Sequence, residues 1–239
     1  MNFILINFGV VVAASSLINF PGRTISFLKK LSKNNNREWF EKNRNFYNKD
    51  FLEPAQEFVI KMGEKLSKIA PEIIAIPKID KSIFRIFRDV RFSKDKSPYK
   101  TNFGAYFWEG EKKMESSGFY FHVDPKEFFI GVGIYMFPKD LLKKYREAAS
   151  DPVTGKELNN ILKSILKNKN YSLGGKNYKK TPTGYDPDNP NADLLLHDGV
   201  YIFYGSKNLN ELKNKPVDFT FKIFKDMLPL HKWFIKNLS

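Results

Sequence analysis

The chain has 239 residues, of which 42% are hydrophobic and 15% are aromatic. This content is enough for the core of one large domain or two small ones, and it excludes a disordered chain and a collagen-like repeat. Cysteine is absent, which excludes thiol nucleophiles, thiolate metal sites and disulfide bonds. Forty Lys and Arg residues against 26 Asp and Glu residues give a formal net charge of +14, so an anionic partner is favoured.

The positive charge is concentrated in two segments of the chain. Residues 81–101 hold seven basic and two acidic residues, and residues 143–180 hold ten basic and three acidic residues. By contrast, residues 186–199 hold four Asp and no Lys or Arg. The basic segments are interpreted either as phosphate contacts for a nucleic acid or another phosphorylated ligand, or as a solvated lysine-rich surface.

Residues 1–20 form an apolar N-terminal extension without a charged side chain. The small residues at 12–16 are similar to a signal-peptide cleavage region, but the basic segment that precedes a secretory signal is missing. We therefore expect a weak signal-like segment, a start assigned too far upstream, or a tail packed on the domain. Residues 21–239 are expected to form a single domain without a membrane span, in the cytoplasm, with export as the alternative.

Helical periodicity follows the extension. Ile25, Leu28 and Leu31 share one side of a short helix that begins near Thr24 and ends in the Asn run 34–36. Asn36 is placed to cap the next helix, and residues 51–69 continue as an amphipathic helix that stops before a proline. The N-terminal third is thus predicted to be three helices.

The period changes to two at residue 82, which predicts strands over 83–88, 102–108, 118–123 and 128–136. Turn residues lie at 112 and 125–126, so these strands are expected to form an antiparallel meander. A helix is predicted from Pro138 to Ala149, and a second, begun by a Thr154–Glu157 capping box, is predicted to run to Leu166.

A loop rich in Gly, Pro and Asn is predicted over 171–191 and a short strand over 200–204, followed by a C-terminal helix that Pro229 kinks. The predicted fold class is therefore α+β: one domain with a mainly antiparallel β-meander, flanked by N-terminal and C-terminal helices.

The densest group of polar side chains lies at residues 85–100, which read R-I-F-R-D-V-R-F-S-K-D-K-S-P-Y-K. This stretch resembles the signature R-x-x-R-D-x-R-F-S-x-D-K-x-P-Y-K of the DUF2461 family, and N-N-N-R-E-W-F at 34–40 is similar to a second element of that family. The resemblance extends over roughly residues 27–235 and implies a cytoplasmic location, but it carries no activity. Asn189 stands where the family commonly has a histidine, which argues against a catalytic role there.

Three functions follow from this group. First, guanidinium and ammonium groups match phosphate or carboxylate, which predicts an anion-binding site. The residues expected to bind the anion are Arg85, Arg88, Arg91, Lys96, Tyr99 and Lys100, with Asp89 and Asp95 orienting the arginines. Second, an enzyme acting on a small anionic substrate would use the arginines as a clamp and Asp89 or His122 as acid or base. Third, the same residues would form a structural Arg–Asp network in an interaction protein.

Several aromatic residues admit two interpretations. They would offer stacking faces to nucleobases or belong to the core, and they are Phe84, Phe87, Tyr99, Tyr106 and Tyr120. No metal site is predicted, because His197 and His231 lack neighbouring ligands, and the Asp-rich loop from Asp186 lacks the Gly and Glu of a calcium loop. No cofactor motif is present, and the oligomeric state is left open.

Overall fold

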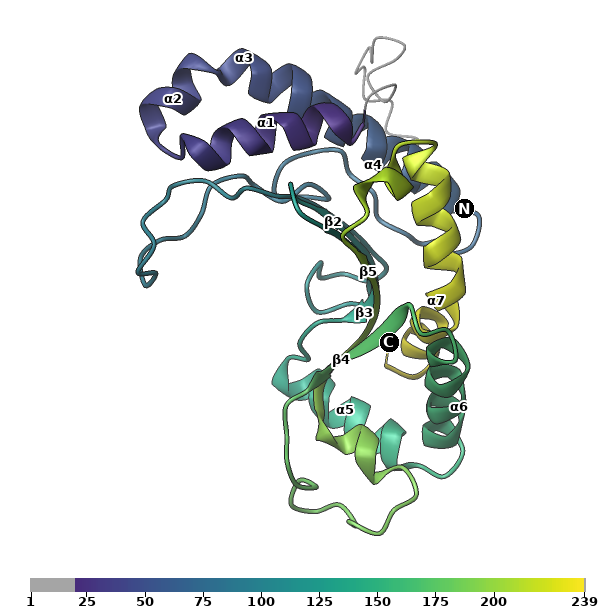
Figure 1. The fold of residues 1–239 in the computed structure, drawn as a ribbon. Helices are drawn as coiled ribbons and strands as arrows, with labels where there is room; N and C mark the ends of the chain where they lie inside the picture. Colours follow the sequence, from purple (N-terminus) through teal and green to yellow (C-terminus); the bar gives the residue numbers. More distant parts are fainter. Residues whose placement is uncertain (1–19, 239) are drawn as a thin grey trace.

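The computed structural model describes residues 20–238, and its centre is a five-stranded sheet in the order β1-β2-β3-β5-β4 (Figure 1). Every neighbouring pair of strands is antiparallel. The predicted α+β fold with a meander and flanking helices is therefore confirmed. The strands are β1 (Phe103–Trp108), β2 (Gly118–Val123), β3 (Phe128–Ile134), β4 (Tyr171–Lys176) and β5 (His197–Ser206).

The helices precede and follow the meander. They are α1 (Gly22–Lys33), α2 (Arg37–Lys42), α3 (Arg44–Phe46), the π-helix η2 (Tyr47–Leu52), α4 (Glu53–Leu66), α5 (Lys139–Ser150), α6 (Thr154–Leu166), the 3-10 helices η3 (Ala192–Leu196) and η4 (Leu209–Leu212), and α7 (Pro216–Leu238). Among residues 20–238, none of these helices combines the length and the apolar character needed to cross a bilayer.

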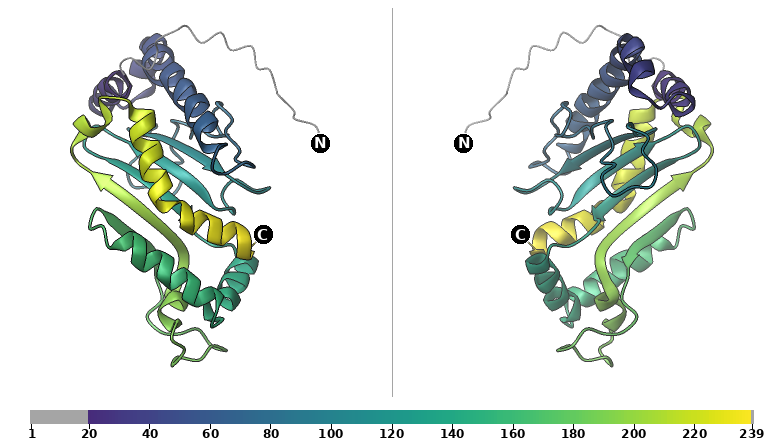
Figure 2. Two further views of the ribbon diagram at one scale, coloured as in Figure 1. Left: turned by 90° about the vertical axis from the view of Figure 1, so that its right-hand side faces the viewer. Right: turned by 90° about the vertical axis from the view of Figure 1, so that its left-hand side faces the viewer.

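The two faces of the sheet have different environments. In β2, Phe119, Phe121 and Val123 are fully buried, whereas Tyr120 and His122 between them are partly exposed. The buried face packs against α4 and α7, as the ring contacts of Phe121 with Phe58 and of Phe119 with Phe224 show. Figure 2 shows α4 and α7 crossing this face in one view, while the opposite view looks onto strands and loops.

The N-terminal helices form largely as predicted. The Asn36 side chain accepts a hydrogen bond of 2.9 Å from the Trp39 backbone N–H, which confirms it as a helix cap. The helix expected over 51–69 begins as the π-helix η2 and ends earlier, at Leu66. The apolar extension at 1–19 lies outside the described residues, but Phe20 is buried, with its ring 5.0 Å from that of Phe58.

Two predictions of local structure were wrong. Residues 83–88 form no strand, since only isolated bridges occur there, of Ile83 with Ile79 and Ala105 and of Phe87 with Tyr99. Conversely, residues 171–176 form β4 on the edge of the sheet, where a loop was expected. Gly175 has a φ of +92° and lies where the register of β4 shifts, so the glycines that suggested a loop permit an irregular edge strand instead.

The predicted start of α6 also needs correction. Thr154 does not cap the helix; its backbone N–H and that of Val153 donate to the Asp151 carboxylate, at 2.8 and 2.9 Å. Asp151 is therefore the capping residue, because a carboxylate satisfies two free donors of the first turn. In the C-terminal helix, Pro229 lies inside α7 as predicted, and α7 changes direction along its length (Figure 2).

A buried polar network joins α7 to the sheet. His231 Nε2 lies 2.8 Å from a Glu109 carboxylate oxygen, and His231 Nδ1 lies 2.9 Å from Ser117 Oγ. The hydrogen bond from His231 holds the pKa of Glu109 below its usual value. All three residues are buried, so the network satisfies both nitrogens of the imidazole that α7 carries into an aromatic core.

We expect His231→Ala to lower the free energy of unfolding by about 3 kcal/mol, because it leaves the Glu109 carboxylate buried without its partner. The stabilisation from Glu109 is present above its unfolded-state pKa and is lost as the pH falls through its lower folded-state pKa. Urea unfolding from pH 7 to pH 3 measures both effects. Lys232→Ala, at the exposed neighbouring position of α7, is the control. Equal stability of the two variants would contradict a stabilising role of the His231–Glu109 interaction.

Candidate functional site: an aromatic cleft with a basic rim

The uncovered face of the sheet holds a cleft of about 480 Å³, which we call the aromatic cleft. Side chains from β1, β2, β3 and β5 line it, together with residues from the loops before β1 and after β1. The lining residues are Phe84, Tyr106, Met114, Gly118, Tyr120, Phe129, Gly131, Val132, Gly133, Tyr135, Tyr201 and Phe203. A sheet face left to solvent ordinarily carries polar side chains, so this apolar surface indicates a ligand or partner.

Glycines form the floor of the aromatic cleft. Gly118 and Gly133 are paired across β2 and β3, and a Cβ at either position would lie 2.3 Å from a backbone oxygen. Gly131 is different, because a Cβ there would meet its nearest neighbours at 3.4 and 3.6 Å, which are ordinary contacts. The backbone therefore requires glycine at 118 and 133, whereas the missing side chain at 131 only keeps the cleft open.

Two lysines lie against the part of the cleft that Phe84 forms, and Arg85 follows Phe84 in the chain. Lys113 Nζ lies 4.2 Å from the centre of the Phe84 ring and Lys100 Nζ lies 5.8 Å from it. Burial lowers the pKa of both lysines. The positive charge of Arg85 further lowers the pKa of Lys100, and the positive charge of Lys100 further lowers the pKa of Lys113. We call Arg85, Lys100 and Lys113 the basic rim.

The basic rim has no carboxylate partner at salt-bridge distance among residues 20–238. Lys113 donates a hydrogen bond to the Lys81 carbonyl, and Arg85 and Lys100 have no side-chain hydrogen bond within that part of the chain. Asp80 acts on both lysines at longer range and raises their pKa values in part. Unpaired cations that repel one another over an aromatic ring are a favourable place for an anion.

The other predicted anion-binding residues lie in an extended loop, residues 87–99, which we call the arm. In Figure 1 the segment between α4 and β1 extends beyond the sheet on the side away from α4 and α7. Arg88 pairs with Asp95 and also donates to the Ser97 carbonyl, at 3.2 Å. Arg91 forms a two-pronged pair with Asp89, with hydrogen bonds of 3.0 and 2.7 Å. Both arginines are thus already occupied within the arm.

The base of the arm rests on the N-terminal helices. Tyr99 is buried, and its ring stacks on that of Phe40 with 4.2 Å between centres. The Asn35 side chain exchanges two hydrogen bonds with the Tyr99 backbone, at 2.9 and 3.1 Å. Lys96 donates to the Val90 carbonyl at 2.9 Å. Of the six predicted anion-binding residues, Lys100 therefore lies against Phe84 at the aromatic cleft, Arg85 acts on Lys100 electrostatically, and the other four lie in the arm or its base.

His122 lies on the uncovered face, opposite to Phe121, next to the aromatic cleft. Its Nδ1 lies 3.0 Å from Tyr120 Oη, and its Nε2 lies 3.7 Å from the Asp124 carboxylate. Burial lowers the pKa of His122 despite the nearby Asp124, and burial raises the pKa of Tyr120 to about 12. Near pH 7 the pair is a neutral imidazole and a protonated phenol. Asp89, the other predicted acid or base, is held by Arg91 in the arm.

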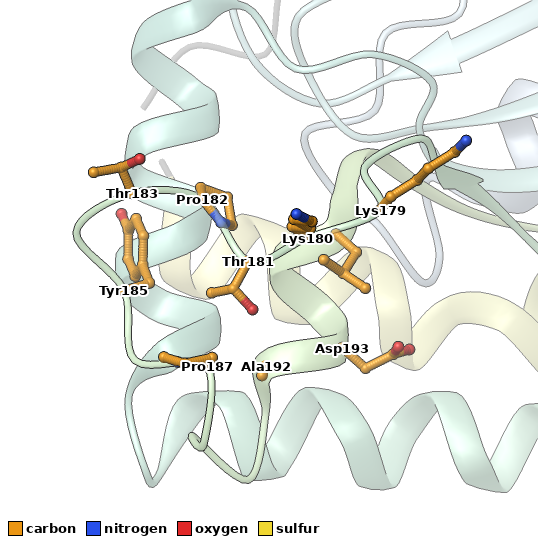
Figure 3. Close-up of a pocket in the computed structure, with 10 residues that line it drawn as sticks. Lys179, Lys180, Thr181, Pro182, Thr183, Tyr185, Pro187, Ala192 and Asp193 are labelled. Carbon is orange, nitrogen blue, oxygen red and sulfur yellow. The ribbon is translucent and has the colours of Figure 1, made fainter.

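A second hollow, of about 620 Å³, lies in the loop before η3 (Figure 3). In Figure 3, Lys179 extends away from Thr181 and Asp193, so the lysines of this loop do not converge on one point. Asp193 is already paired with Lys176. Within residues 20–238, no group of three or more His, Asp or Glu side chains is arranged to hold a metal ion. The aromatic cleft is therefore the stronger candidate.

Sequence reasoning missed Lys113 and the glycine floor. Lys113 lies in the loop between β1 and β2, which the sequence showed only as a turn. A signal for the floor was present: glycines and aromatic residues share alternate positions of β2 and β3 from Gly118 to Gly133. Phe84, Tyr106 and Tyr120, named from the sequence as possible stacking faces, do line the cleft.

The chain is an α+β protein in which the sequence elements at 34–40 and 85–100 are joined by the hydrogen bonds between Asn35 and Tyr99. The family model of a conserved hypothetical protein, DUF2461, matches residues 23–233, and the chain belongs to this family. No curated protein and no solved structure matches the chain at a significant level.

We expect Arg88→Ala to loosen the arm with little effect on the melting temperature, because its partner Asp95 is exposed and becomes hydrated. Hydrogen bonds from Ser97 and then from Arg88 lower the pKa of Asp95 to about 2. The Arg88–Asp95 pair should therefore persist in the wild type until the pH falls well below 4. NMR titration of the Asp95 carboxyl should give a higher pKa in Arg88→Ala and in Ser97→Ala. An unchanged pKa in both variants would contradict this geometry.

Proposed function

We propose that this protein binds a phosphorylated ligand that carries a planar base, with the base in the aromatic cleft and the phosphate on the basic rim. Nucleotides and single-stranded nucleic acids share this chemistry. The observation that carries the proposal is the position of Phe84, whose ring lines the cleft and also contacts Lys100 and Lys113. Apolar stacking surface and unpaired positive charge thus meet at one side chain.

The dimensions and chemistry of the cleft support this ligand class. A volume of about 480 Å³ lies within the range of small-molecule sites. Bases stack on aromatic faces regardless of their identity, and the partly exposed Tyr120 and Phe129 offer such faces beside the open floor at Gly131. A simple metabolite anion without an apolar part would use the rim but leave the cleft empty, so it fits the site less well.

A second candidate function is an enzyme that acts on the same ligand. The Tyr120–His122 pair supports it, because Tyr120 lines the cleft and its hydroxyl lies beside a neutral imidazole. In that case His122 would be the base. His122→Ala would then abolish turnover of a bound nucleotide, measured as released phosphate or nucleoside, while its affinity stays within about threefold of wild type. If the wild type binds the nucleotide without turning it over, the enzyme hypothesis is wrong and only the binding function stands.

The proposed function predicts that a nucleoside triphosphate binds to the full chain and that Gly131→Val prevents binding. Valine favours a strand, and its Cβ would make only ordinary contacts, at 3.4 Å or more, so the melting temperature should stay close to that of the wild type while the side chain fills the cleft floor. Calorimetric titration measures the affinity and thermal unfolding the stability. Wild-type affinity in Gly131→Val would show that the ligand does not use the cleft.

The double variant Lys100→Gln, Lys113→Gln tests the rim separately. It should weaken nucleotide binding by about tenfold or more and reduce the dependence of binding on salt, because two charge-assisted contacts are removed. The matched control is Lys112→Gln, one residue away, whose amino group is exposed and paired with Glu115. Equal losses of nucleotide affinity in the rim variant and the control would indicate that the overall positive charge alone attracts the nucleotide.

A further inference from the structure

Phe92 at the tip of the arm is almost completely exposed, with 96% of its surface accessible. A phenylalanine in this position leaves its whole apolar surface in water, which is unfavourable unless a ligand covers it. Its two neighbours in the chain are Arg91 and Ser93, and within residues 20–238 its ring has one ring contact, with the Arg91 guanidinium 5.8 Å from its centre.

The arm that carries Phe92 is held in shape by its own polar residues. The pairs Arg88–Asp95 and Arg91–Asp89 and the hydrogen bond from Lys96 to Val90 all join residues of the arm to one another. A loop ordered in this way loses little conformational freedom when it binds. The signature residues therefore build a scaffold, and the side chain that this scaffold presents to a partner is Phe92.

Aromatic and cationic side chains continue from the aromatic cleft to the tip. Phe84 lies at the cleft and Phe87, 50% exposed, lies at the base of the arm, where it bridges to Tyr99. Lys100 donates its backbone N–H to the Ile86 carbonyl, so the basic rim is directly continuous with the arm. Near Phe92, Lys94 is exposed and has no ion pair or side-chain hydrogen bond among residues 20–238, whereas Arg91 is paired with Asp89.

We infer that the ligand is a single-stranded nucleic acid that occupies the aromatic cleft with one base and continues along the arm, where another base stacks on Phe92. This inference rests on the proposed function and extends it from a mononucleotide to a strand. Alternating aromatic and basic side chains suit a strand, because bases stack on the rings while phosphates contact the cations. A protein partner would fit the apolar tip alone, without a use for the cations that lead to it.

The test compares a fluorescein-labelled oligonucleotide of about ten nucleotides, as DNA and as RNA, with a nucleoside triphosphate. For the oligonucleotide, affinity is measured by fluorescence anisotropy of the full chain. Phe92→Ala should weaken oligonucleotide binding by about tenfold and leave nucleotide binding and the melting temperature unchanged. Phe92→Trp should retain oligonucleotide binding. Val153→Ala, which truncates another exposed apolar side chain, is the control.

The outcomes separate this inference from the proposed function. If Gly131→Val abolishes binding of both ligands and Phe92→Ala changes neither, the aromatic cleft is a nucleotide site and the inference about a strand is overturned. Equal affinity of the wild type for the oligonucleotide and the nucleotide would overturn it as well. If neither ligand binds the wild type, the proposed function itself fails and the inference fails with it.

Discussion

The alternation of side chains in the antiparallel sheet is the constraint on which the rest of the structure depends. Each strand must direct every second residue toward α4 and α7, and Phe103, Phe121 and Ile130 do so with no exposed surface. The intervening residues then share the opposite face, whatever their chemistry. Here they are glycines and aromatic residues, and no helix of residues 20–238 covers them (Figure 2). The aromatic cleft is thus a direct consequence of a sheet that is apolar on both faces but covered on only one.

The signature at residues 85–100 combines a structural role and a candidate binding role in separate residues. Arg88 and Arg91 are paired with carboxylates inside the arm, and Tyr99 holds its base against Phe40. Lys100 lies against Phe84 of the cleft, and neither it nor Arg85 has a carboxylate at salt-bridge distance among residues 20–238. The hypotheses of a structural Arg–Asp network and of an anion site therefore do not exclude each other. A substitution in the first group tests the arm, and one in the second tests the site.

The sequence was sufficient for the elements whose periodicity is strong. The helices from Gly22 and from Lys139, and the strands β1, β2 and β3, lie within a few residues of their predicted positions. It failed at residues 83–88, where alternating Ile, Phe and Arg suggested a strand but the backbone bonds mainly to the start of β1 and the end of the arm. It also failed at β4, because Gly174 and Gly175 are common in loops and their fit beneath Tyr201 and beside Gly199 depends on tertiary contacts.

The candidate site was only partly predictable for a related reason. A run of basic residues in a sequence does not show which cations are paired with carboxylates. That pairing decides which cations are available to a ligand. Arg91 is paired by Asp89, two residues away, which local spacing allows. Lys113 and Lys100 are thirteen residues apart and meet only because β1 brings the loop that follows it back to Phe84.

The electrostatics of the basic rim oppose folding when no ligand is bound. Burial lowers the pKa values of Lys100 and Lys113, and so does the repulsion of Lys100 by Arg85 and of Lys113 by Lys100, so the protonated lysines are less stable in the folded chain than in water. At neutral pH this opposes folding, because a depressed lysine pKa means that the unfolded state binds the proton more tightly. Nearby carboxylates would remove the penalty, and the arm shows that this chain places them beside Arg88 and Arg91. Their absence from salt-bridge distance of the rim, among the described residues, is understandable if a bound phosphate supplies the missing negative charge.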